Sequence, residues 1–288
     1  MLLSKENIRY VVSEALKEDA AFGDITTLTF IPASVRIQAM IFAKEDGVVC
    51  GIPLARETFK VFDPKTRFNP RMKDGQSIKK GQVIAIVTGR ARSILSCERV
   101  ALNFISYLSG ISTDTQKAVR RVKSRGIQIL DTRKTTPLLR VFEKYAVLSG
   151  GGKNHRLDLS KQYLVKDNHL SILRKSKKLS LLSERALKIP FEIEVESLEE
   201  LKSFLFYFPD IIMLDNFSPE NIRKAIRVVR QMFPVKDKRP LIELSGGITP
   251  LNLSQFAIRG VDFISLGALT HSARALDISL EIIKVYSR

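Results

Sequence analysis

The chain has little cysteine: Cys50 and Cys97 are the two cysteines among its 288 residues. Two cysteines cannot form a disulfide framework, so the sequence predicts a protein of a reducing compartment, the cytoplasm. We expect both to be small buried side chains, and a reactive thiol is the less favoured alternative.

Long hydrophobic runs are also missing. No apolar stretch approaches the roughly 18–20 residues of a membrane-spanning helix, so we expect no membrane association. The first residues are amphipathic and carry acids, without an apolar core and small-residue cleavage site, so we expect no signal peptide. Apolar residues make up 44% of the chain and charged residues 27%. These values fit a globular protein with a large core, organised as one large domain or two unequal ones.

Acidic residues are few relative to basic ones, and the net charge is +17. Such an excess suits nucleic acid, a membrane surface or anionic substrates. Part of it is a run that we interpret as a solvated helix face, made of Arg174, Lys175, Lys177 and Lys178. Because no recognition helix, zinc-ligand spacing or aromatic-rich strand motif accompanies the charge, a basic nucleic-acid-binding barrel protein is a disfavoured alternative.

The second part of the chain contains six short apolar runs that predict buried strands. They are Ile127–Leu130, Tyr163–Val165, Phe191–Val195, Ile211–Leu214, Leu241–Leu244 and Phe263–Leu266. Most are followed by a helical pattern, and this alternation predicts parallel strands with right-handed crossovers. Six such units indicate a closed or partly open α/β barrel. Each run ends in polar or small residues, which is where barrels carry their functional side chains.

The first part of the chain has a different pattern. Residues 35–100 read as β-rich, with Arg36–Ala43 as a strand and several turn signals after it. We therefore predict an α/β protein, an open α/β barrel with a smaller β-rich α/β sandwich domain at the N-terminus. The expected divisions are a sandwich domain with flanking helices over 1–110, a barrel domain over 111–272, and a C-terminal helix over 273–288 that packs back on the N-terminal domain.

Cations gather between residues 130 and 170, interleaved with apolar runs and a glycine triplet. They are Arg133, Lys134, His155, Arg156, Lys166 and His169. Cations at the ends of buried strands suggest a pocket for a multiply anionic small molecule. His155 and Arg156 follow the glycine triplet and look like ligand contacts, since arginine binds carboxylates in a bidentate way. The histidine spacing matches no zinc motif, so we expect no metal bound by histidine.

Carboxylates alternate along one predicted strand. Glu192, Glu194 and Glu196 share one face of it, and Asp215 ends the next strand, so Asp215 should neighbour one of them. An interior carboxylate is costly unless it is paired or metal-bound. A pair of carboxylates beside a cationic pocket suits Mg²⁺ or sugar hydroxyls. A salt bridge to one of the pocket cations is an equally favoured alternative.

Glycine marks the ends of the last two predicted strands, in Ser245-Gly246-Gly247 and at Gly267. Barrels commonly bind phosphate on the loops after their late strands. Glycine lets backbone N–H groups approach a phosphate closely. Two such strand ends together predict a phosphate site.

These stretches together resemble the quinolinate phosphoribosyltransferase family. The matching segments follow the family's order over nearly the whole chain: EDAAFGDITT, CERVALNFISYLSGIST, LDTRKTTP, EKYAVLSGGGKNHRLDLS, LVKDNHL, EIEVESLEEL, IIMLDNFSPE, ELSGGI and ISLGALTHSARALDISL. The resemblance implies a homodimer with shared active sites, with a higher assembly such as a hexamer left open. It implies transfer of phosphoribose from phosphoribosyl pyrophosphate to quinolinate with decarboxylation, giving nicotinate mononucleotide, CO₂ and pyrophosphate in NAD biosynthesis, with Mg²⁺.

The resemblance also implies a role for individual residues. It assigns catalysis to Lys134, Glu194 and Asp215, and Mg²⁺, held directly or indirectly, to Glu194 and Asp215. It assigns quinolinate to Arg133, His155, Arg156 and Lys166, together with Arg99, which should reach the partner subunit's site. It assigns the 5′-phosphate to Ser245, Gly246, Gly247 and Gly267.

Two positions depart from the family pattern. Leu138 stands where the family commonly has glycine after TTP, and Asp158 stands where it commonly has glycine after the HR pair. Both positions flank the expected pocket. The alternative is a related protein with another acceptor, such as a molybdenum-transport-associated homologue, but the NHRLDL and KDNH elements favour quinolinate.

Overall fold

The structure is a computed structural model that describes residues 3–183 and 189–286. The chain divides into two compact units. The sheet unit comprises Met1–Gln116, Thr135–Gly151 and Leu269–Arg288, and the barrel unit comprises Lys117–Lys134 and Gly152–Ala268. The expected boundary near residue 110 is close to the first division, whereas residues 135–151 belong to the sheet unit and not to the barrel.

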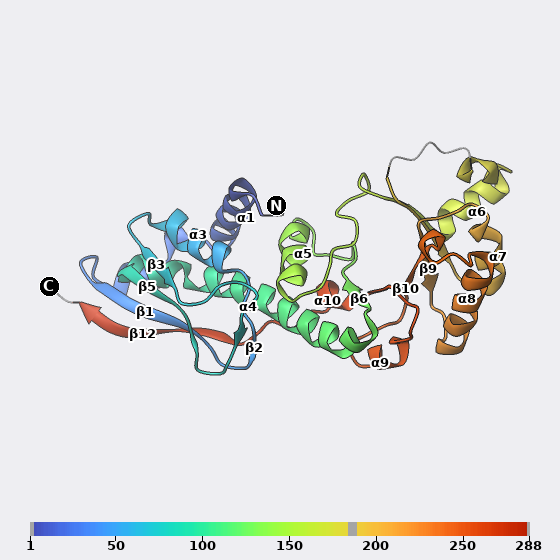
Figure 1. Cartoon of the computed structure of the whole chain (residues 1–288). Coiled ribbons are helices and arrows are strands. Elements are labelled where there is room, and N and C mark those ends of the chain that lie inside the picture. Colours follow the sequence, from blue (N-terminus) through green and yellow to red (C-terminus); the bar gives the residue numbers. More distant parts are fainter. Residues whose placement is uncertain (1–2, 184–188, 287–288) are drawn as a thin grey trace. The chain divides into compact units, whose positions relative to one another are not determined.

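The sheet unit is built on an antiparallel sheet with strand order β12, β1, β5, β3 (Figure 1). Its strands are β1 (Arg36–Ala43), β3 (Arg67–Pro70), β5 (Val83–Arg90) and β12 (Ile278–Tyr286), with a separate pair β2 (Gly47–Val48) and β4 (Ser77–Ile78). Strand β1 alternates buried and more exposed residues, which is the pattern of a sheet with one covered face. The helices that share its core include α1 (Lys5–Glu18), α3 (Ile52–Phe62) and α4 (Ala91–Val122).

The C-terminal segment is a strand, so the helix expected over 273–288 is wrong. Strand β12 runs antiparallel to β1, with Ile278 opposite Ala43 and Tyr286 opposite Arg36, and it therefore does join the N-terminal sheet. The segment is rich in isoleucine and valine, whose branched side chains favour an extended backbone, and pairing with β1 satisfies its backbone groups. Residues 287–288 lie outside the described part of the chain.

The region expected to be β-rich also contains a helix. Helix α3 starts just after Gly51, which has a φ of 100°, and carries a proline in its first turn. Its buried residues follow helical spacing. Further helices of the chain are α2 (Ile25–Phe30), α5 (Arg140–Ser149) and α10 (Ala268–His271). Among the described residues, no helix is long and apolar enough to cross a membrane.

The barrel unit contains a parallel sheet whose described strands run in the order β6, β11, β10, β9, β8, β7. These strands are β6 (Gln128–Leu130), β7 (Tyr163–Val165), β8 (Phe191–Val195), β9 (Ile211–Asp215), β10 (Leu241–Ser245) and β11 (Phe263–Ser265). All six predicted strands are confirmed. Because β6 and β7 form opposite edges of the sheet in the described chain, the barrel is open, as expected.

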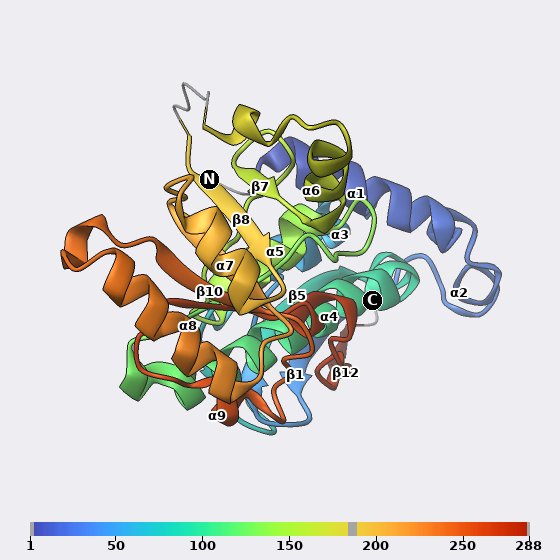
Figure 2. The same cartoon turned by 90° about the vertical axis from the view of Figure 1, so that its right-hand side faces the viewer.

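Helices follow most of these strands. They are α6 (Asp167–Lys175), α7 (Leu198–Leu205), α8 (Pro219–Met232) and α9 (Leu253–Phe256). Helices α7 and α8 pack side by side outside the strands (Figure 2). Helix α8 begins where the Ser218 hydroxyl accepts the backbone N–H of Asn221 at 3.2 Å. The basic run Arg174, Lys175, Lys177 and Lys178 is exposed, as predicted for a solvated face.

Candidate active site at the strand ends of the barrel unit

The carboxyl ends of the barrel strands collect most of the predicted site residues. Arg133 and Lys134 follow β6, Lys166 follows β7, Glu194 lies in β8, Asp215 ends β9, Ser245 ends β10, and Gly267 follows β11. Parallel strands bring these ends to one edge of the sheet. Of the predicted residues, Arg99 belongs to the sheet unit, where it is exposed on α4, and its approach to any active site stays a prediction.

Lys166 and Glu194 form an ion pair across neighbouring strands β7 and β8. The Lys166 ammonium donates to a carboxylate oxygen of Glu194, whose side chain is 7% exposed, against 43% for Lys166. Lys166 also precedes α6, and its backbone N–H donates to Nδ1 of His169 at 3.0 Å. His169 therefore stabilises the start of α6. Glu194 forms a salt bridge with a pocket cation, which was one of the two alternatives for this carboxylate.

Asp215 lies on the strand beside Glu194. Glu194 is opposite Met213 in the β8–β9 pairing, and Asp215 is opposite Ser245 in the β9–β10 pairing. Asn216 donates its backbone N–H to the Ser245 carbonyl at 3.0 Å and its side-chain amide to the Asp215 carboxylate at 2.7 Å. These contacts hold the Asp215 carboxylate at the strand end, half-buried.

Glycine is required in the loop after β10. Gly246 and Gly247 have φ values of 84° and 62°, a left-handed conformation that favours glycine. A Cβ atom on Gly246 would lie 2.3 Å from the side-chain oxygen of Asn216. The loop is therefore compact at the strand end, and backbone groups rather than side chains line it at these two residues.

Arg133 and Arg156 lie close enough to influence each other. The pKa of Arg156 is lowered, first by burial and then by the charge of Arg133, while Glu192 opposes the shift. The Arg156 guanidinium donates to the carbonyl oxygen of Gln162 at 3.1 Å. Two guanidiniums whose charges act on one another supply positive charge of the kind that suits a ligand with two carboxylates.

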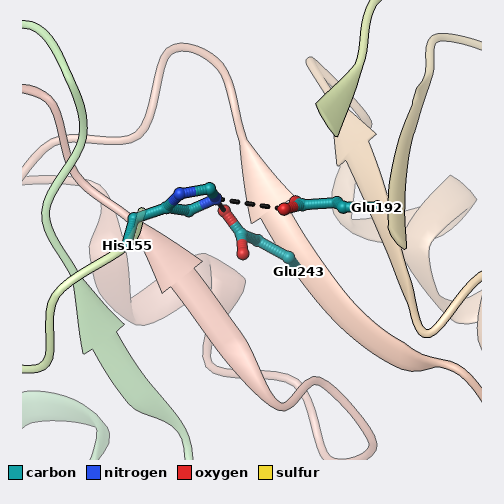
Figure 3. A group of neighbouring side chains, drawn as sticks. All are labelled: His155, Glu192 and Glu243. Carbon is teal, nitrogen blue, oxygen red and sulfur yellow. Dashed lines mark ion pairs between the residues drawn. The ribbon is translucent and has the colours of Figure 1, made fainter. Parts of the chain in front are cut away.

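A second group of side chains lies within the barrel unit and is called here the deep cluster: His155, Glu192 and Glu243 (Figure 3). His155 Nε2 is 3.1 Å from Glu192 Oε2 and 3.6 Å from Glu243 Oε1. Both carboxylates are fully buried, and the His155 side chain is 7% exposed. Figure 3 shows the imidazole pointing toward both carboxylates.

The deep cluster is supported from the surrounding strands. Gln162 donates its side-chain amide to Glu192 at 2.7 Å, and the Ser265 hydroxyl donates to Glu243. The backbone N–H of His155 donates to Asp131 at 2.9 Å. One oxygen of Glu192 and one of Glu243 are buried with no hydrogen-bond partner in the described chain.

Burial dominates the electrostatics of the two acids. It raises the pKa of Glu192 to about 8, against the opposing charges of Arg156 and Lys166. It also raises the pKa of Glu243 to about 8, and the charge of Glu192 adds to this shift. Near neutral pH the pair therefore carries less than two full negative charges.

The donor atoms of the deep cluster lie within 4.8 Å of one another, a spacing that could hold a metal ion. The expectation that histidine binds no metal stays a prediction. Sequence reasoning singled out Glu192 but missed Glu243 and Ser265. An isolated acid within the apolar run Leu241–Leu244 was the available signal for Glu243, because a charged residue is rarely buried without a partner.

Comparison with known proteins identifies the family. The model of the quinolinate phosphoribosyl transferase N-terminal domain matches residues 24–109, and that of its C-terminal domain matches residues 111–281. The chain belongs to the quinolinate phosphoribosyl transferase family. The two matches follow one another along the chain, the first ending at residue 109 and the second beginning at residue 111.

Relatives match over nearly their whole length. A probable nicotinate-nucleotide pyrophosphorylase (carboxylating) of Methanocaldococcus jannaschii is 40% identical over 95% of this chain and 96% of its own. The Mycobacterium leprae nicotinate-nucleotide pyrophosphorylase (carboxylating) is 38% identical, over 95% and 96% of the two chains. The solved structure of NadC from Streptococcus pyogenes aligns with a TM-score of 0.89 at 38% identity, over 99% and 98% of the two chains.

Proposed function

We propose that the protein transfers phosphoribose from phosphoribosyl pyrophosphate to quinolinate and releases CO₂ and pyrophosphate, leaving nicotinate mononucleotide for NAD synthesis. One observation carries the proposal. A chain whose two domains both match the quinolinate phosphoribosyl transferase models also gathers paired cations, carboxylates and a compact glycine loop at one edge of its barrel sheet. A dicarboxylate acceptor and a phosphorylated ribose donor need groups of these kinds.

Arg133 and Arg156 are the proposed partners of the two quinolinate carboxylates. Guanidinium groups bind carboxylates through paired hydrogen bonds, and two of them in one place fit a dicarboxylate. Lys166, which is partly exposed, and Lys134, which is exposed, would neutralise further substrate charge. Ser245, Gly246, Gly247 and Gly267 would receive the 5′-phosphate.

The reaction requires two bond exchanges. The bond between ribose C1′ and pyrophosphate breaks and the pyridine nitrogen bonds to C1′, with positive charge developing on the ribose, which Glu194 and Asp215 would stabilise. The positive ring nitrogen then draws the electron pair of the breaking C–C bond as CO₂ leaves the adjacent carbon, which takes up a proton. The protein mainly positions the reactants and compensates charge.

Mg²⁺ is part of the proposal. Glu194 and Asp215 offer carboxylate oxygens on neighbouring strands, and oxygen ligands of this kind are the ones that Mg²⁺ prefers. When bound, the ion would neutralise charge on the pyrophosphate group of the donor. Glu194 would share its carboxylate between the ion and Lys166.

A homodimer in the cytoplasm is also proposed. The region around α2 exposes large apolar side chains, Phe22, Ile25, Leu28 and Phe30, which a partner surface would cover. Both cysteines are free and buried, in keeping with a reducing compartment, and burial raises the pKa of Cys50 to about 12.

A subunit-mixing experiment tests the shared active site. If Arg99 contributes to the partner's site, mixing Arg99→Ala with Lys166→Met subunits should restore part of the activity that each variant lacks. Failure to restore it after subunit exchange would contradict a shared site.

The function is tested by a coupled assay of the purified protein with quinolinate, phosphoribosyl pyrophosphate and Mg²⁺. We expect equal amounts of nicotinate mononucleotide and CO₂, and no product when any one component is omitted or Mg²⁺ is chelated. Binding of phosphoribosyl pyrophosphate without product would point to another acceptor. Tight, salt-sensitive nucleic-acid binding without binding of either substrate would contradict the proposal.

A further inference from the structure

We infer that Glu192 and Glu243 are positioning residues that hold His155 by its Nε2 atom, and that His155 in turn fixes the backbone of Arg156 for acceptor binding. The inference rests on the proposed function, because it assigns Arg156 to quinolinate. Under this inference His155 supports the acceptor-binding Arg156 and does not itself contact the acceptor. The inference also assigns a positioning role to Glu243.

The hydrogen bonds of the imidazole carry the argument. Nδ1 of His155 accepts the backbone N–H of Arg156 at 2.7 Å, so the neutral ring carries its proton on Nε2. Nε2 faces Glu192 at 3.1 Å and Glu243 at 3.6 Å (Figure 3). Both ring nitrogens therefore have protein partners in a side chain that is almost entirely buried. A ring engaged on both sides is suited to orienting its neighbours.

The network reaches Arg156 by two routes. The backbone of Arg156 is held by His155, and its guanidinium donates to the Gln162 carbonyl at 3.1 Å, while the Gln162 side chain donates to Glu192 at 2.7 Å. Glu192 is thus linked to both ends of Arg156. A bidentate carboxylate contact depends on the orientation of the arginine, so a loosened support should weaken acceptor binding first.

Glu243 is anchored separately from Glu192. It lies on β10, whereas Glu192 lies on β8, and the Ser265 hydroxyl of β11 donates to it. Removing Glu243 leaves the buried Ser265 hydroxyl without its partner and leaves Glu192 as the carboxylate that faces Nε2 of His155. We expect this change to loosen the orientation of the imidazole and to lower stability.

Glu243 is tested with a matched pair of variants. Glu243→Gln keeps a hydrogen-bonding side chain of the same shape, whereas Glu243→Met removes it. We expect Glu243→Met to raise the quinolinate Kd and KM about tenfold, with the phosphoribosyl pyrophosphate KM unchanged and Glu243→Gln within about threefold of wild type. An equal loss for both substrates, or a lower melting temperature with normal quinolinate binding, would assign Glu243 a merely structural role and overturn the inference.

A second pair tests the two sides of the ring if Glu243→Met does not fold. His155→Asn places an amide oxygen near the Nδ1 position, and His155→Gln places an amide N–H near the Nε2 position. Each should retain quinolinate binding better than His155→Ala. Equal binding by His155→Ala and wild type would overturn the inference.

The tautomer of the His155 ring can be measured independently of enzymatic activity. With three histidines in the chain, ¹⁵N spectra of labelled protein can be assigned by comparison with His155→Gln. We expect the Nε2–H tautomer for His155 in the wild type. The Nδ1–H tautomer, or a stoichiometric metal ion that His155→Gln loses, would contradict the hydrogen-bonding account. Wild-type protein that shows this tautomer but binds no quinolinate would instead refute the proposed function.

Discussion

Glu192 and Glu194 lie two residues apart on strand β8, yet their surroundings differ. Glu194 pairs with a partly exposed lysine near the carboxyl end of the strand, whereas Glu192 faces an imidazole and a second carboxylate deeper in the barrel. Strand alternation directs both to one face, and two residues of strand separate them by roughly 6–7 Å of depth. Position along the strand therefore separates a carboxylate that pairs with a partly exposed lysine from one that faces buried side chains.

The two levels also differ in charge. The level at the strand ends, called here the upper level, contains Arg133, Arg156, Lys166, Glu194 and Asp215, and much of it is reachable by solvent. The deep cluster contains two acids whose pKa burial raises to about 8. We therefore expect changes in the upper level to act on substrates, and changes in the deep cluster to act on orientation and stability.

The largest effect should come from breaking the ion pair of the upper level. Lys166→Met leaves the Glu194 carboxylate buried without its cation and removes a charge that we propose faces the substrates. We expect kcat/KM for nicotinate mononucleotide formation to fall by about two to three orders of magnitude. Lys175→Met, on the exposed end of α6, is the control and should stay near wild type. A similar loss in both variants would contradict the assignment.

Arg156→Ala tests the acceptor side of the upper level while leaving the deep cluster side chains in place. We expect quinolinate affinity to fall about a hundredfold, because a charged, bidentate partner is lost. Arg133→Ala should behave similarly, and binding of phosphoribosyl pyrophosphate should change little in both. Isothermal titration calorimetry measures each affinity directly. Unchanged quinolinate affinity in both variants would contradict the assignment of Arg133 and Arg156 to quinolinate binding.

The deep cluster predicts a pH dependence of stability. Burial, and then the charge of Glu192, raises the folded-state pKa of Glu243 from 4.5 to about 8 against the opposing effects of His155, Ser265 and Lys166. The folded protein therefore holds this proton more tightly than the unfolded chain. Its contribution to stability is fully present below about pH 4.5 and is lost as the pH rises through about 8. We expect Glu243→Gln to reduce the fall in melting temperature between pH 5.5 and 8.5 by on the order of 5 °C.

Thermal unfolding across this pH range supplies the measurement. Glu220→Gln is the matched control, because Glu220 is exposed on α8 and pairs with Lys224 on the surface. It should keep the wild-type dependence on pH. A Glu243→Gln protein with the wild-type slope would show that Glu243 is ionised in the folded state.

The smallest effect should come from a residue that belongs to neither level. Leu138 lies in the sheet unit with a φ of 66° and is 80% exposed, so glycine there would relieve a left-handed backbone without losing burial. The relief is partly offset by the greater freedom of glycine in the unfolded chain, so we expect a net stabilisation of about 0.5 kcal/mol. Leu138→Ala keeps the left-handed strain and should not stabilise. Chemical denaturation measures the free energy of unfolding of both variants and of the wild type.

The barrel could be predicted from sequence because each strand is a short apolar run with a polar end. The same regularity predicts that Lys166, Glu194, Asp215 and Ser245 lie at one edge of the sheet. The φ of Leu138 likewise favours glycine, which is the residue that the family resemblance led us to expect at that position. Position along a strand was enough for these inferences.

Side-chain depth and long-range pairing could not be read in this way. Strand β12 depends on pairing with β1, more than two hundred residues earlier, so local pattern alone suggested a helix. The role of His155 depends on Glu243, which is distant in sequence and lies on another strand. The ion pair of Glu194 with Lys166 likewise depends on β7 and β8 being neighbours in the sheet.

The most direct test of the two-level account is the ¹⁵N spectrum of His155 as quinolinate is added. The account predicts that His155 keeps its Nε2–H tautomer at saturation, because both ring nitrogens stay with protein partners, while the Arg156 side-chain signals move. A loss of the Nε2–H tautomer, or protonation of Nδ1 on adding quinolinate, would show that His155 leaves the deep cluster to contact the acceptor. That result would contradict the division between the level that binds substrates and the cluster that supports it.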